Sequence, residues 1–307
     1  MNKWHSPQIY GILGYPITHS LSPAMHNAAF KALGIDAEYT LFEVKPEELE
    51  RFLLEDSVVT DIKGTTCKSS DIAGLNITIP HKIKAKEILE KNFPTDSSYP
   101  AQENFYYVTL SGAINTVKRM NRGWQYYNTD AHGFLRSLEG DLKFVTEDKK
   151  VLVIGCGGAG RAIIAALSWK NMQISKIYAS DIRQEAMEAA KQHFGQFAHL
   201  ENKLKFVVTE DIPEVIKECD LLVNASPVGM KKDDGSVVDK KLFHSNLFVY
   251  DVVYNRETAL IKDAASQGLP GAGGLGMLLY QGVKAFELWT GKPAPVEKMR
   301  SALTEGL

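Results

Sequence analysis

The stretch KKVLVIGCGGAGRAIIAALSWK, residues 149–170, predicts the fold of the second half of the chain. It opens with a β-branched apolar run after a lysine pair, which is typical of a buried parallel strand. A glycine turn that fits the pattern GxGxxG follows, and an apolar helical segment comes next. Glycines permit a tight turn and let backbone N–H groups approach a pyrophosphate at the helix N-terminus. We therefore predict a Rossmann-type dinucleotide-binding domain whose cofactor-binding turn consists of Gly155, Gly157, Gly158, Ala159 and Gly160.

Strand-like and helix-like segments alternate around this turn. The expected strands cover 176–181, 205–210, 220–226 and 247–254, and the expected helices cover 185–194, 212–219 and 276–291. Such alternation indicates βαβ units and a mainly parallel sheet, so the predicted fold class is α/β, doubly wound. No strong strand precedes a second glycine cluster, 271–276. That cluster suits a close approach to the nicotinamide end of the cofactor at Gly274, or a hinge between domains.

Asp181 bears on which dinucleotide is bound. It ends the predicted second strand, a little beyond the offset of about 20 residues at which a ribose-binding acid is expected. A carboxylate there accepts hydrogen bonds from both ribose hydroxyls and repels a 2′-phosphate, which favours NAD over NADP. Arg183 could neutralise that phosphate, so NADP stays open as a cofactor. The alternative role for Asp181 is the N-cap of the helix that begins QEAMEAA.

The first half predicts a second α/β domain. Its expected elements are strands over 8–16, 38–44 and 75–80, helices over 22–34 and 82–91, a β-hairpin of 114–120 and 124–130, and a loop over 93–111. A chain of 307 residues has room for two such domains. We expect 1–129 plus 276–307 to form a substrate-binding catalytic domain and 130–275 the Rossmann NAD(P)-binding domain, with a cleft between them that closes around the substrate.

Composition narrows the class of partner. Apolar residues make up 44% and charged residues 23%, which is ordinary for a soluble globular protein. A net charge of −2 gives no electrostatic basis for binding nucleic acid or an anionic membrane, and no segment reaches membrane-spanning length. Cys67, Cys156 and Cys219 are widely spaced and odd in number, which favours a reducing compartment. We expect a cytoplasmic enzyme that acts on a small molecule.

Lys82 and Asp130 are suited to acid–base chemistry. Lys82 follows the predicted strand of NITIP and starts the next helix, where a cation is electrostatically disfavoured. Active sites of α/β proteins usually lie at such strand ends, and a lysine there can exchange a proton with an alcohol or ketone. Asp130 ends the second strand of the predicted hairpin and could orient the lysine. By itself, this pattern favours a solvated surface lysine, which is the commonest situation of a lysine.

Seven separated stretches occur in the order found in shikimate dehydrogenases. They are GYPITHSLSPAMHNAAF, NITIPHK, GAINTV, NTDAHGF, GCGGAGRA, NASPVGM and GMLLYQG. They span nearly the whole chain, which therefore resembles this family, including its shikimate/quinate dehydrogenase branch. The resemblance implies reversible reduction of 3-dehydroshikimate to shikimate with a nicotinamide cofactor, in aromatic amino-acid biosynthesis.

The resemblance also implies residue roles. Lys82 and Asp130 match the catalytic pair, in which the lysine protonates the ketone oxygen and the aspartate holds the lysine and the substrate hydroxyl in line. The matching substrate-binding residues are Ser20 and Ser22 for the carboxylate, Thr78, Asn115 and Gln281 for hydroxyl or carboxylate groups, and Tyr254 from the cofactor domain. Further cofactor contacts are expected from Asn224, Ser226, Val252 and Gly274, the first two through their backbone.

The stretch HSLSP, residues 19–23, is expected to do two things. Pro23 suits a first helical turn and Ser22 suits the N-cap before it. Capping uses an acceptor of the Ser22 hydroxyl and leaves its proton free to donate, and Ser20 supplies a second donor. The stretch is therefore expected both to start a helix and to bind a carboxylate.

Some segments depart from the family pattern. Residues 60–74 and 93–112 look unlike the usual segments there and could reshape the substrate pocket or an interface. After the second Rossmann strand, Ser180-Asp181-Ile182 stands where the family commonly has Asn-Arg-Thr, whose arginine binds the 2′-phosphate of NADP. This favours NAD and the shikimate/quinate branch, but no residue decides between quinate and shikimate.

Two functions of other kinds stay as alternatives. One is a non-catalytic ligand-sensing regulator on the same fold, against which Lys82 and Asp130 argue. The other is a related reductase of a different substrate, against which the paired serines and NITIPHK argue. No metal is expected, because His19, His26, His81 and His132 lack metal-ligand spacing. The resemblance suggests a monomer or a homodimer.

Overall fold

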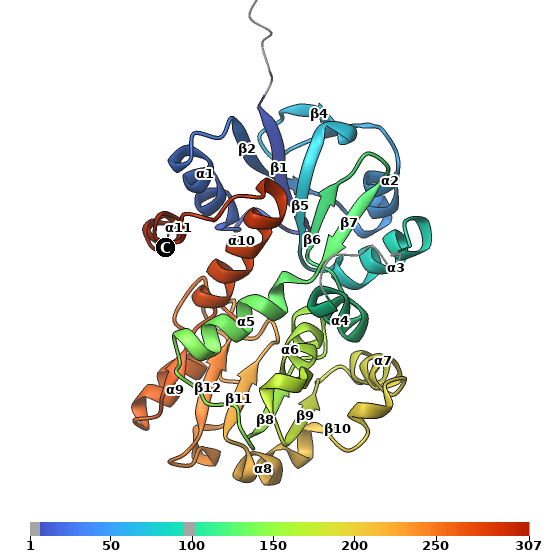
Figure 1. Cartoon of the computed structure of the whole chain (residues 1–307). Helices are drawn as coiled ribbons and strands as arrows, with labels where there is room; N and C mark the ends of the chain where they lie inside the picture. The colour runs from blue at the N-terminus through green and yellow to red at the C-terminus, as the bar shows by residue number, and fades with distance from the viewer. Residues whose placement is uncertain (1–6, 95–101, 307) are drawn as a thin grey trace, which may run out of the picture. The chain divides into compact units, whose positions relative to one another are not determined.

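The computed structural model describes residues 7–94 and 102–306, which form two compact units (Figure 1). The first unit comprises 7–94, 102–108, 113–129 and 281–306, and the second unit comprises 109–112 and 130–280. None of the helices within these described ranges is long and apolar enough to cross a bilayer.

The first unit is built on a five-stranded sheet of order β2-β1-β5-β6-β7. Its first three strands are parallel, and β6 and β7 form the antiparallel hairpin expected from the sequence. The strands are β1 (Gln8–Gly14), β2 (Ala37–Glu43), β5 (Ile72–Ile77), β6 (Thr116–Arg119) and β7 (Trp124–Tyr127). Leu13, Leu75 and Val117, each from a different strand, are fully buried in one apolar core that joins the strands.

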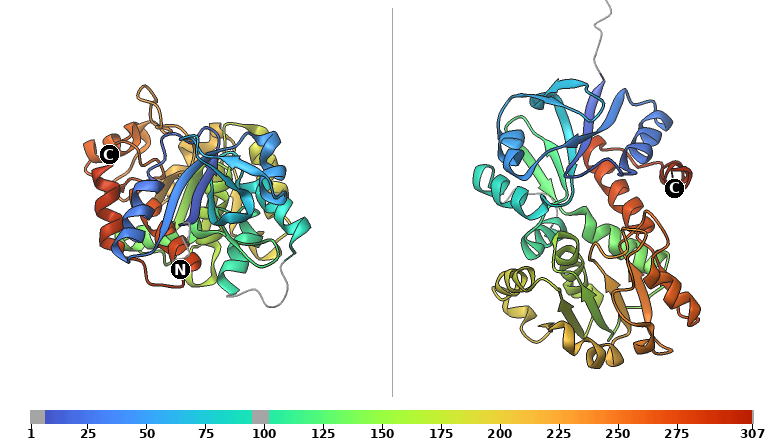
Figure 2. Two further views of the ribbon diagram at one scale, coloured as in Figure 1. Left: turned by 90° about the horizontal axis from the view of Figure 1, so that it is seen from above. Right: turned by 180° about the vertical axis from the view of Figure 1, so that it is seen from behind.

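Helices cover this sheet. They are α1 (Ser22–Ala32), α2 (Leu49–Leu54), α3 (Lys82–Asn92), α4 (Gln102–Ser111, which ends in the second unit), the last part of α10 (Leu275–Thr290) and α11 (Val296–Glu305). Although α1 and α11 come from opposite ends of the sequence, they pack side by side (Figure 2). Gly74 of β5 leaves the room that the Trp289 ring of α10 occupies, because a Cβ at Gly74 would overlap that ring.

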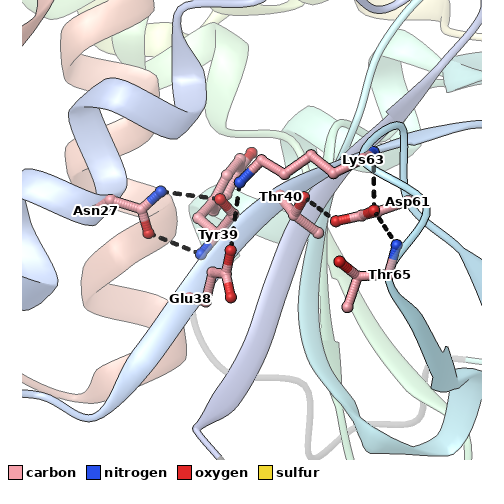
Figure 3. Close-up of polar contacts among 7 residues, drawn as sticks. All are labelled: Asn27, Glu38, Tyr39, Thr40, Asp61, Lys63 and Thr65. Atoms are coloured by element: carbon pink, nitrogen blue, oxygen red, sulfur yellow. Dashed lines mark hydrogen bonds and ion pairs between the residues drawn. The ribbon is translucent and has the colours of Figure 1, made fainter.

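The segment that departs from the family pattern, 60–74, belongs mostly to a small hairpin of β3 (Val58–Thr60) and β4 (Thr66–Lys68). Figure 3 shows how Asp61 ties its turn to β2: the carboxylate accepts hydrogen bonds from the Thr65 N–H at 2.8 Å and from the Thr40 hydroxyl at 2.7 Å. Asn27 pairs with both main-chain groups of Tyr39 on the same edge strand. These contacts cover polar groups along β2 that an open sheet edge would expose.

The second unit has a six-stranded parallel sheet of order β10-β9-β8-β11-β12-β13. Numbered within the unit this order is 3-2-1-4-5-6, the Rossmann order, so the predicted α/β doubly wound fold class is confirmed. The strands are β8 (Lys150–Ile154), β9 (Lys176–Ser180), β10 (Leu204–Phe206), β11 (Leu221–Asn224), β12 (Phe248–Asp251) and β13 (Gly271–Ala272). Its helices are α5 (Thr129–Gly140), α6 (Gly158–Ser168), α7 (Gln184–Phe194), α8 (Ile212–Val215), α9 (Ala259–Ser266) and the start of α10.

Short 3-10 helices connect several of these elements. They are η1 (Pro46–Glu48), η2 (Ser69–Asp71), η3 (Lys170–Met172), η4 (Ala198–Leu200), η5 (Thr209–Asp211), η6 (Ile216–Glu218) and η7 (Lys240–Leu242).

Three local predictions are wrong. The segment 93–111, expected to be a loop, contains helix α4. The two prolines of the segment, Pro94 and Pro100, come before the helix in the sequence and so do not interrupt it. Residues 95–101 lie outside the described residues. The second hairpin strand ends at Tyr127, because Thr129 and Asp130 begin α5, where such short polar side chains are favoured. Ser22 is the first residue of α1 rather than its N-cap, which is Leu21 without a capping side chain among the described residues.

Candidate active site

The glycine turn of the second unit has the geometry that its sequence predicts. Gly155 follows β8 with a φ of +109°, and a Cβ there would lie 2.7 Å from the Ala225 carbonyl carbon. A Cβ at Gly160 would overlap the Gly155 carbonyl oxygen. Both positions therefore exclude a side chain, which keeps the turn between β8 and α6 tight.

Gly157 differs from its neighbours because space is open around it. It is the N-cap of α6, no described side chain caps that helix, and a Cβ at Gly157 would meet nothing within 4 Å. Gly158 and Ala159 form the half-buried first turn behind it. A helix start with open space and uncapped N–H groups binds phosphate well, so the residues present fit the pyrophosphate of a dinucleotide.

Asp181 is tied to this turn. Its Oδ2 accepts a hydrogen bond from the Cys156 N–H at 2.8 Å, and its Oδ1 accepts one from the Arg183 N–H at 2.9 Å. Arg183 Nε lies 3.5 Å from the same Oδ1, with the arginine side chain 68% exposed and the aspartate side chain 6% exposed. The capping alternative for Asp181 is wrong, since the N-cap of α7 is Arg183. The carboxylate keeps free lone pairs that could still accept from a ribose.

The remaining predicted cofactor residues lie beyond the carboxyl ends of β11 and β12. The Val252 N–H donates to the Asn224 carbonyl at 2.9 Å, so the two loops are paired from their first residues. Gly274 donates to the Val253 carbonyl, and a Cβ at Gly274 would overlap Val252. Ser226 lies against the Asn224 side chain. Parallel strands with a crossover between neighbours bind ligands at this edge, and the structure brings these four residues together there.

Asn115 is the centre of a buried polar cluster in the first unit. Its amide nitrogen donates to Thr129 Oγ1 at 2.9 Å and to Gln281 Oε1 at 3.3 Å. Its amide oxygen accepts from the Thr129 N–H at 2.7 Å. The predicted pair of Asn115 and Gln281 is thus joined although 166 positions separate them in sequence. Asn76 and Tyr39 extend the cluster, with the Tyr39 hydroxyl 2.7 Å from Asn76 Oδ1.

Lys82 lies at the start of α3, as predicted. It is half-buried, and its carbonyl accepts the Ile114 N–H at 3.0 Å, which links α3 to the residue before Asn115. Thr78 is half-buried in the turn between β5 and α3, and its N–H donates to the Leu13 carbonyl. Asp130 lies in the first turn of α5, at the start of the second unit, and is 5% exposed.

Ser20 and Ser22 lie together in the first unit. The Ser22 N–H donates to Ser20 Oγ at 3.3 Å, so Ser20, rather than Ser22, uses its hydroxyl as an acceptor at the start of α1. The Ser20 hydroxyl proton stays available to donate. Ser20 is half-buried and Ser22 is 1% exposed. Tyr254 is half-buried in the second unit, where burial raises the pKa of its phenol, so the phenol stays protonated at neutral pH.

Sequence reasoning missed some residues of these clusters. Asp251 accepts three hydrogen bonds behind the β11 and β12 loops, and its signal was available: it is an acid at a strand end, like Asp181. Thr129 bonds to the Asn115 side chain and Asn76 donates to the Asn115 carbonyl, but both are ordinary polar residues in a helix start and a strand. No group of three or more His, Cys, Asp or Glu residues that could hold a metal ion occurs within 7–94 and 102–306.

The chain falls into the class of two-unit α/β proteins with a dinucleotide-binding unit. This class is defined here by the Rossmann strand order, the glycine turn and Asp181 beside that turn. Two family models match: the shikimate dehydrogenase substrate binding domain over residues 12–98 and the shikimate 5′-dehydrogenase C-terminal domain over 274–304. A shikimate dehydrogenase (NADP(+)) of Methanopyrus kandleri is 36% identical over 97% of this chain and 96% of its own.

Solved structures agree with this. A shikimate dehydrogenase in complex with NADP+ superposes with a TM-score of 0.78 at 31% identity, covering 97% of this chain and 95% of that one. A quinate dehydrogenase from Corynebacterium glutamicum in complex with NAD gives a TM-score of 0.77 at 27% identity, covering 97% and 99%. The chain belongs to the shikimate dehydrogenase family and is an NAD(P)-dependent oxidoreductase.

Proposed function

We propose that this chain catalyses the reversible NAD(P)-dependent reduction of 3-dehydroshikimate to shikimate. The observation that carries the proposal is the match over nearly the whole chain to a relative of that name. Three free thiols, two of them buried, suit a reducing cytoplasm, where aromatic amino-acid biosynthesis would use the product.

The predicted substrate-binding and catalytic residues would bind the acid and move its proton. The Ser20 and Ser22 hydroxyls would donate to the substrate carboxylate, and Thr78 and the joined amides of Asn115 and Gln281 would bind ring hydroxyls or the carboxylate. Lys82 would give a proton to the ketone oxygen in reduction and take it from the hydroxyl in oxidation. Asp130 would orient Lys82, and the Tyr254 phenol would donate to the substrate.

The second unit would hold the dinucleotide. The open space at Gly157 and the first turn of α6 would receive its phosphates, and Asp181 would face the adenosine ribose. When bound, the nicotinamide supplies or accepts the hydride.

We further propose that NAD is the preferred cofactor, in contrast to the NADP(+) in the name of the Methanopyrus relative. The support is Asp181, a buried carboxylate beside the turn, where a 2′-phosphate would meet negative charge. The exposed Arg183 side chain lies beside that carboxylate and would partly neutralise a 2′-phosphate, so some use of NADP is expected. The quinate dehydrogenase neighbour with NAD makes quinate the second substrate to test.

Steady-state oxidation of shikimate and quinate, each with NAD and with NADP, tests both proposals. We expect shikimate turnover, with a kcat/KM for NAD above that for NADP. Turnover of neither acid with either cofactor would overturn the proposed activity. Turnover of shikimate with NADP alone would overturn the cofactor preference and leave the activity standing.

A further inference from the structure

Asp251 is a buried carboxylate without a cationic partner. It is the last residue of β12 and is 0% exposed, and no ion pair to it forms among the described residues. Burial raises the pKa of its carboxyl, although donated hydrogen bonds oppose that rise. A buried carboxyl costs stability unless its oxygens are hydrogen-bonded, so the donors around Asp251 matter.

Three segments donate to this one carboxylate. Oδ1 accepts from the Asn224 amide at 2.9 Å and from the Val253 N–H at 3.0 Å. Oδ2 accepts from the Thr258 hydroxyl at 2.7 Å, and Thr258 is also the N-cap of α9. Asn224 and Asp251 are register partners on β11 and β12, so their side chains leave the two parallel strands at the same point. The loop after β11, the loop after β12 and the start of α9 therefore meet at Asp251.

The Asn224 side chain makes its full set of hydrogen bonds inside the protein. The Asn224 amide donates to the Val228 carbonyl as well as to Asp251, and its oxygen accepts from the Ser226 N–H at 3.0 Å and hydroxyl at 2.6 Å. The Ser226 hydroxyl accepts in turn from the Val228 N–H. Since an amide has two donor hydrogens and an oxygen with two lone pairs, nothing is left for a ligand. The Asn224 side chain can therefore act on a dinucleotide only by shaping the main chain of its loop.

Strand order indicates which half of a dinucleotide these loops face. The glycine turn and Asp181 belong to β8 and β9, the half of a Rossmann sheet that takes the adenosine. The loops after β11 and β12 belong to the other half, across the switch point, which takes the second mononucleotide.

We propose that Asp251 is a positioning residue that fixes the main chain of both loops at the nicotinamide half of the dinucleotide site. This rests on the proposed function, because it takes the ligand to be NAD or NADP. It makes the adenosine half and the nicotinamide half depend on different carboxylates, Asp181 and Asp251.

The test separates the two halves with Asp251→Ala. The dissociation constants of NADH or NADPH, whichever the wild type binds more tightly, and of its adenosine fragment, ADP or 2′,5′-ADP, are measured by calorimetry. Removing an acceptor from three buried donors is expected to weaken binding of the dinucleotide by about tenfold and to leave the fragment within about twofold. The kcat for shikimate oxidation is expected to fall as well, with little change in the KM for shikimate.

Asp220→Asn is the matched control. Asp220 precedes β11 at the opposite, amino edge of the same sheet, where it accepts the Lys150 N–H at 2.9 Å and Lys149 Nζ at 3.0 Å. It should lower the melting temperature without separating the two affinities. Thr258→Val, which removes one donor to Asp251, should give the same separation at smaller size and serves where Asp251→Ala does not fold.

Equal loss of both affinities, or loss of neither, in the folded variants would overturn the role of Asp251. If this occurs while the wild type oxidises shikimate, the proposed function stands and only the positioning role falls. A wild type that binds neither dinucleotide would overturn both.

Discussion

The two units build their candidate sites from different materials. In the second unit, Gly155 and Gly160 have no room for a side chain, and the binding groups are backbone N–H groups at the start of α6. In the first unit, Asn115 is held by Thr129 and Gln281, and these three side chains come from separate stretches of the chain. The former site depends on the shape of one local turn, and the latter depends on the whole first unit being folded.

This difference predicts different kinds of failure. Crowding the backbone should damage binding in the second unit, whereas truncating a side chain should damage chemistry in the first. Substitutions that separate binding from catalysis therefore test whether the two units differ in this way.

The largest effect is expected from Lys82→Ala. Loss of the proton donor should lower kcat by about 10²- to 10⁴-fold with little change in the KM for shikimate, because proton transfer belongs to the transition state. Steady-state kinetics with both substrates measures this. Lys84→Ala is the control, since Lys84 is an exposed residue of the same helix paired with Glu87. A kcat within a few-fold of the wild type for Lys82→Ala would remove the acid–base role.

Next in size is a contrast between two glycines of one turn. Gly160→Ala places a methyl group on the Gly155 carbonyl, and strain of about 3 kcal/mol would weaken dinucleotide binding by about a hundredfold and lower the melting temperature. Gly157→Ala places its methyl group in open space at φ −74°, so the protein should keep its melting temperature while the added carbon crowds the phosphates. Calorimetric titration with NADH and NADPH, alongside thermal unfolding, separates the two. If Gly157→Ala bound as the wild type does, the phosphates would not lie there.

The contrast between the units also explains what the sequence could predict. The Rossmann turn can be predicted from the sequence because its geometry depends on a few consecutive residues, the GxGxxG pattern between a strand and a helix. The structure has that turn at Gly155–Gly160. Lys82 was correctly placed at a helix start because strand and helix periodicity change at NITIPHK.

Contacts between segments that are distant in the sequence cannot be predicted from a local pattern. Nothing near Asn115 in the sequence predicts that Thr129 satisfies its amide, or that Asn76 bonds to the Tyr39 hydroxyl. The capping role of Ser22 was wrong because a serine before a proline fits both the N-cap and the first helical residue. Helix α4 was missed because two prolines dominated its neighbourhood although neither lies inside it.

A buried histidine in the first unit predicts an effect of pH on stability. His26 is 0% exposed and stacks on Tyr39 with its ring centroid 4.5 Å away, and neither ring nitrogen has a partner among the described residues. Burial lowers the pKa of His26 to about 3 from 6.5. The folded state therefore resists a proton that the unfolded state accepts below pH 6.5, and stability is lost as the pH falls from there toward 3.

This loss should reach about 2 kcal/mol at pH 5, since each pH unit below 6.5 contributes about 1.4 kcal/mol. Urea unfolding of the wild type and of His26→Leu at pH 7 and pH 5 measures it. The variant should lose about 2 kcal/mol less than the wild type across that interval, whatever its stability at pH 7. Parallel pH dependence of the two proteins would mean that His26 takes up its proton in the folded state.

The smallest effect, about tenfold, concerns Asp181, the buried carboxylate beside the glycine turn. Asp181→Ala should lower the ratio of kcat/KM for NAD to that for NADP by about this factor, because a 2′-phosphate would no longer face a carboxylate. Arg183→Ala should raise the same ratio, since it removes the exposed cation beside that position.

The structure also gives Asp181 a second role, which the same experiment separates. The carboxylate holds the Cys156 N–H inside the glycine turn, so its removal could loosen the turn for both dinucleotides. Equal loss of kcat/KM for NAD and NADP would assign Asp181 to shaping the turn, and an unequal loss would assign it to choosing the cofactor. If the loss is equal, the sites of the two units would both depend on a buried side chain, because Asp181 would hold the backbone of the glycine turn in place.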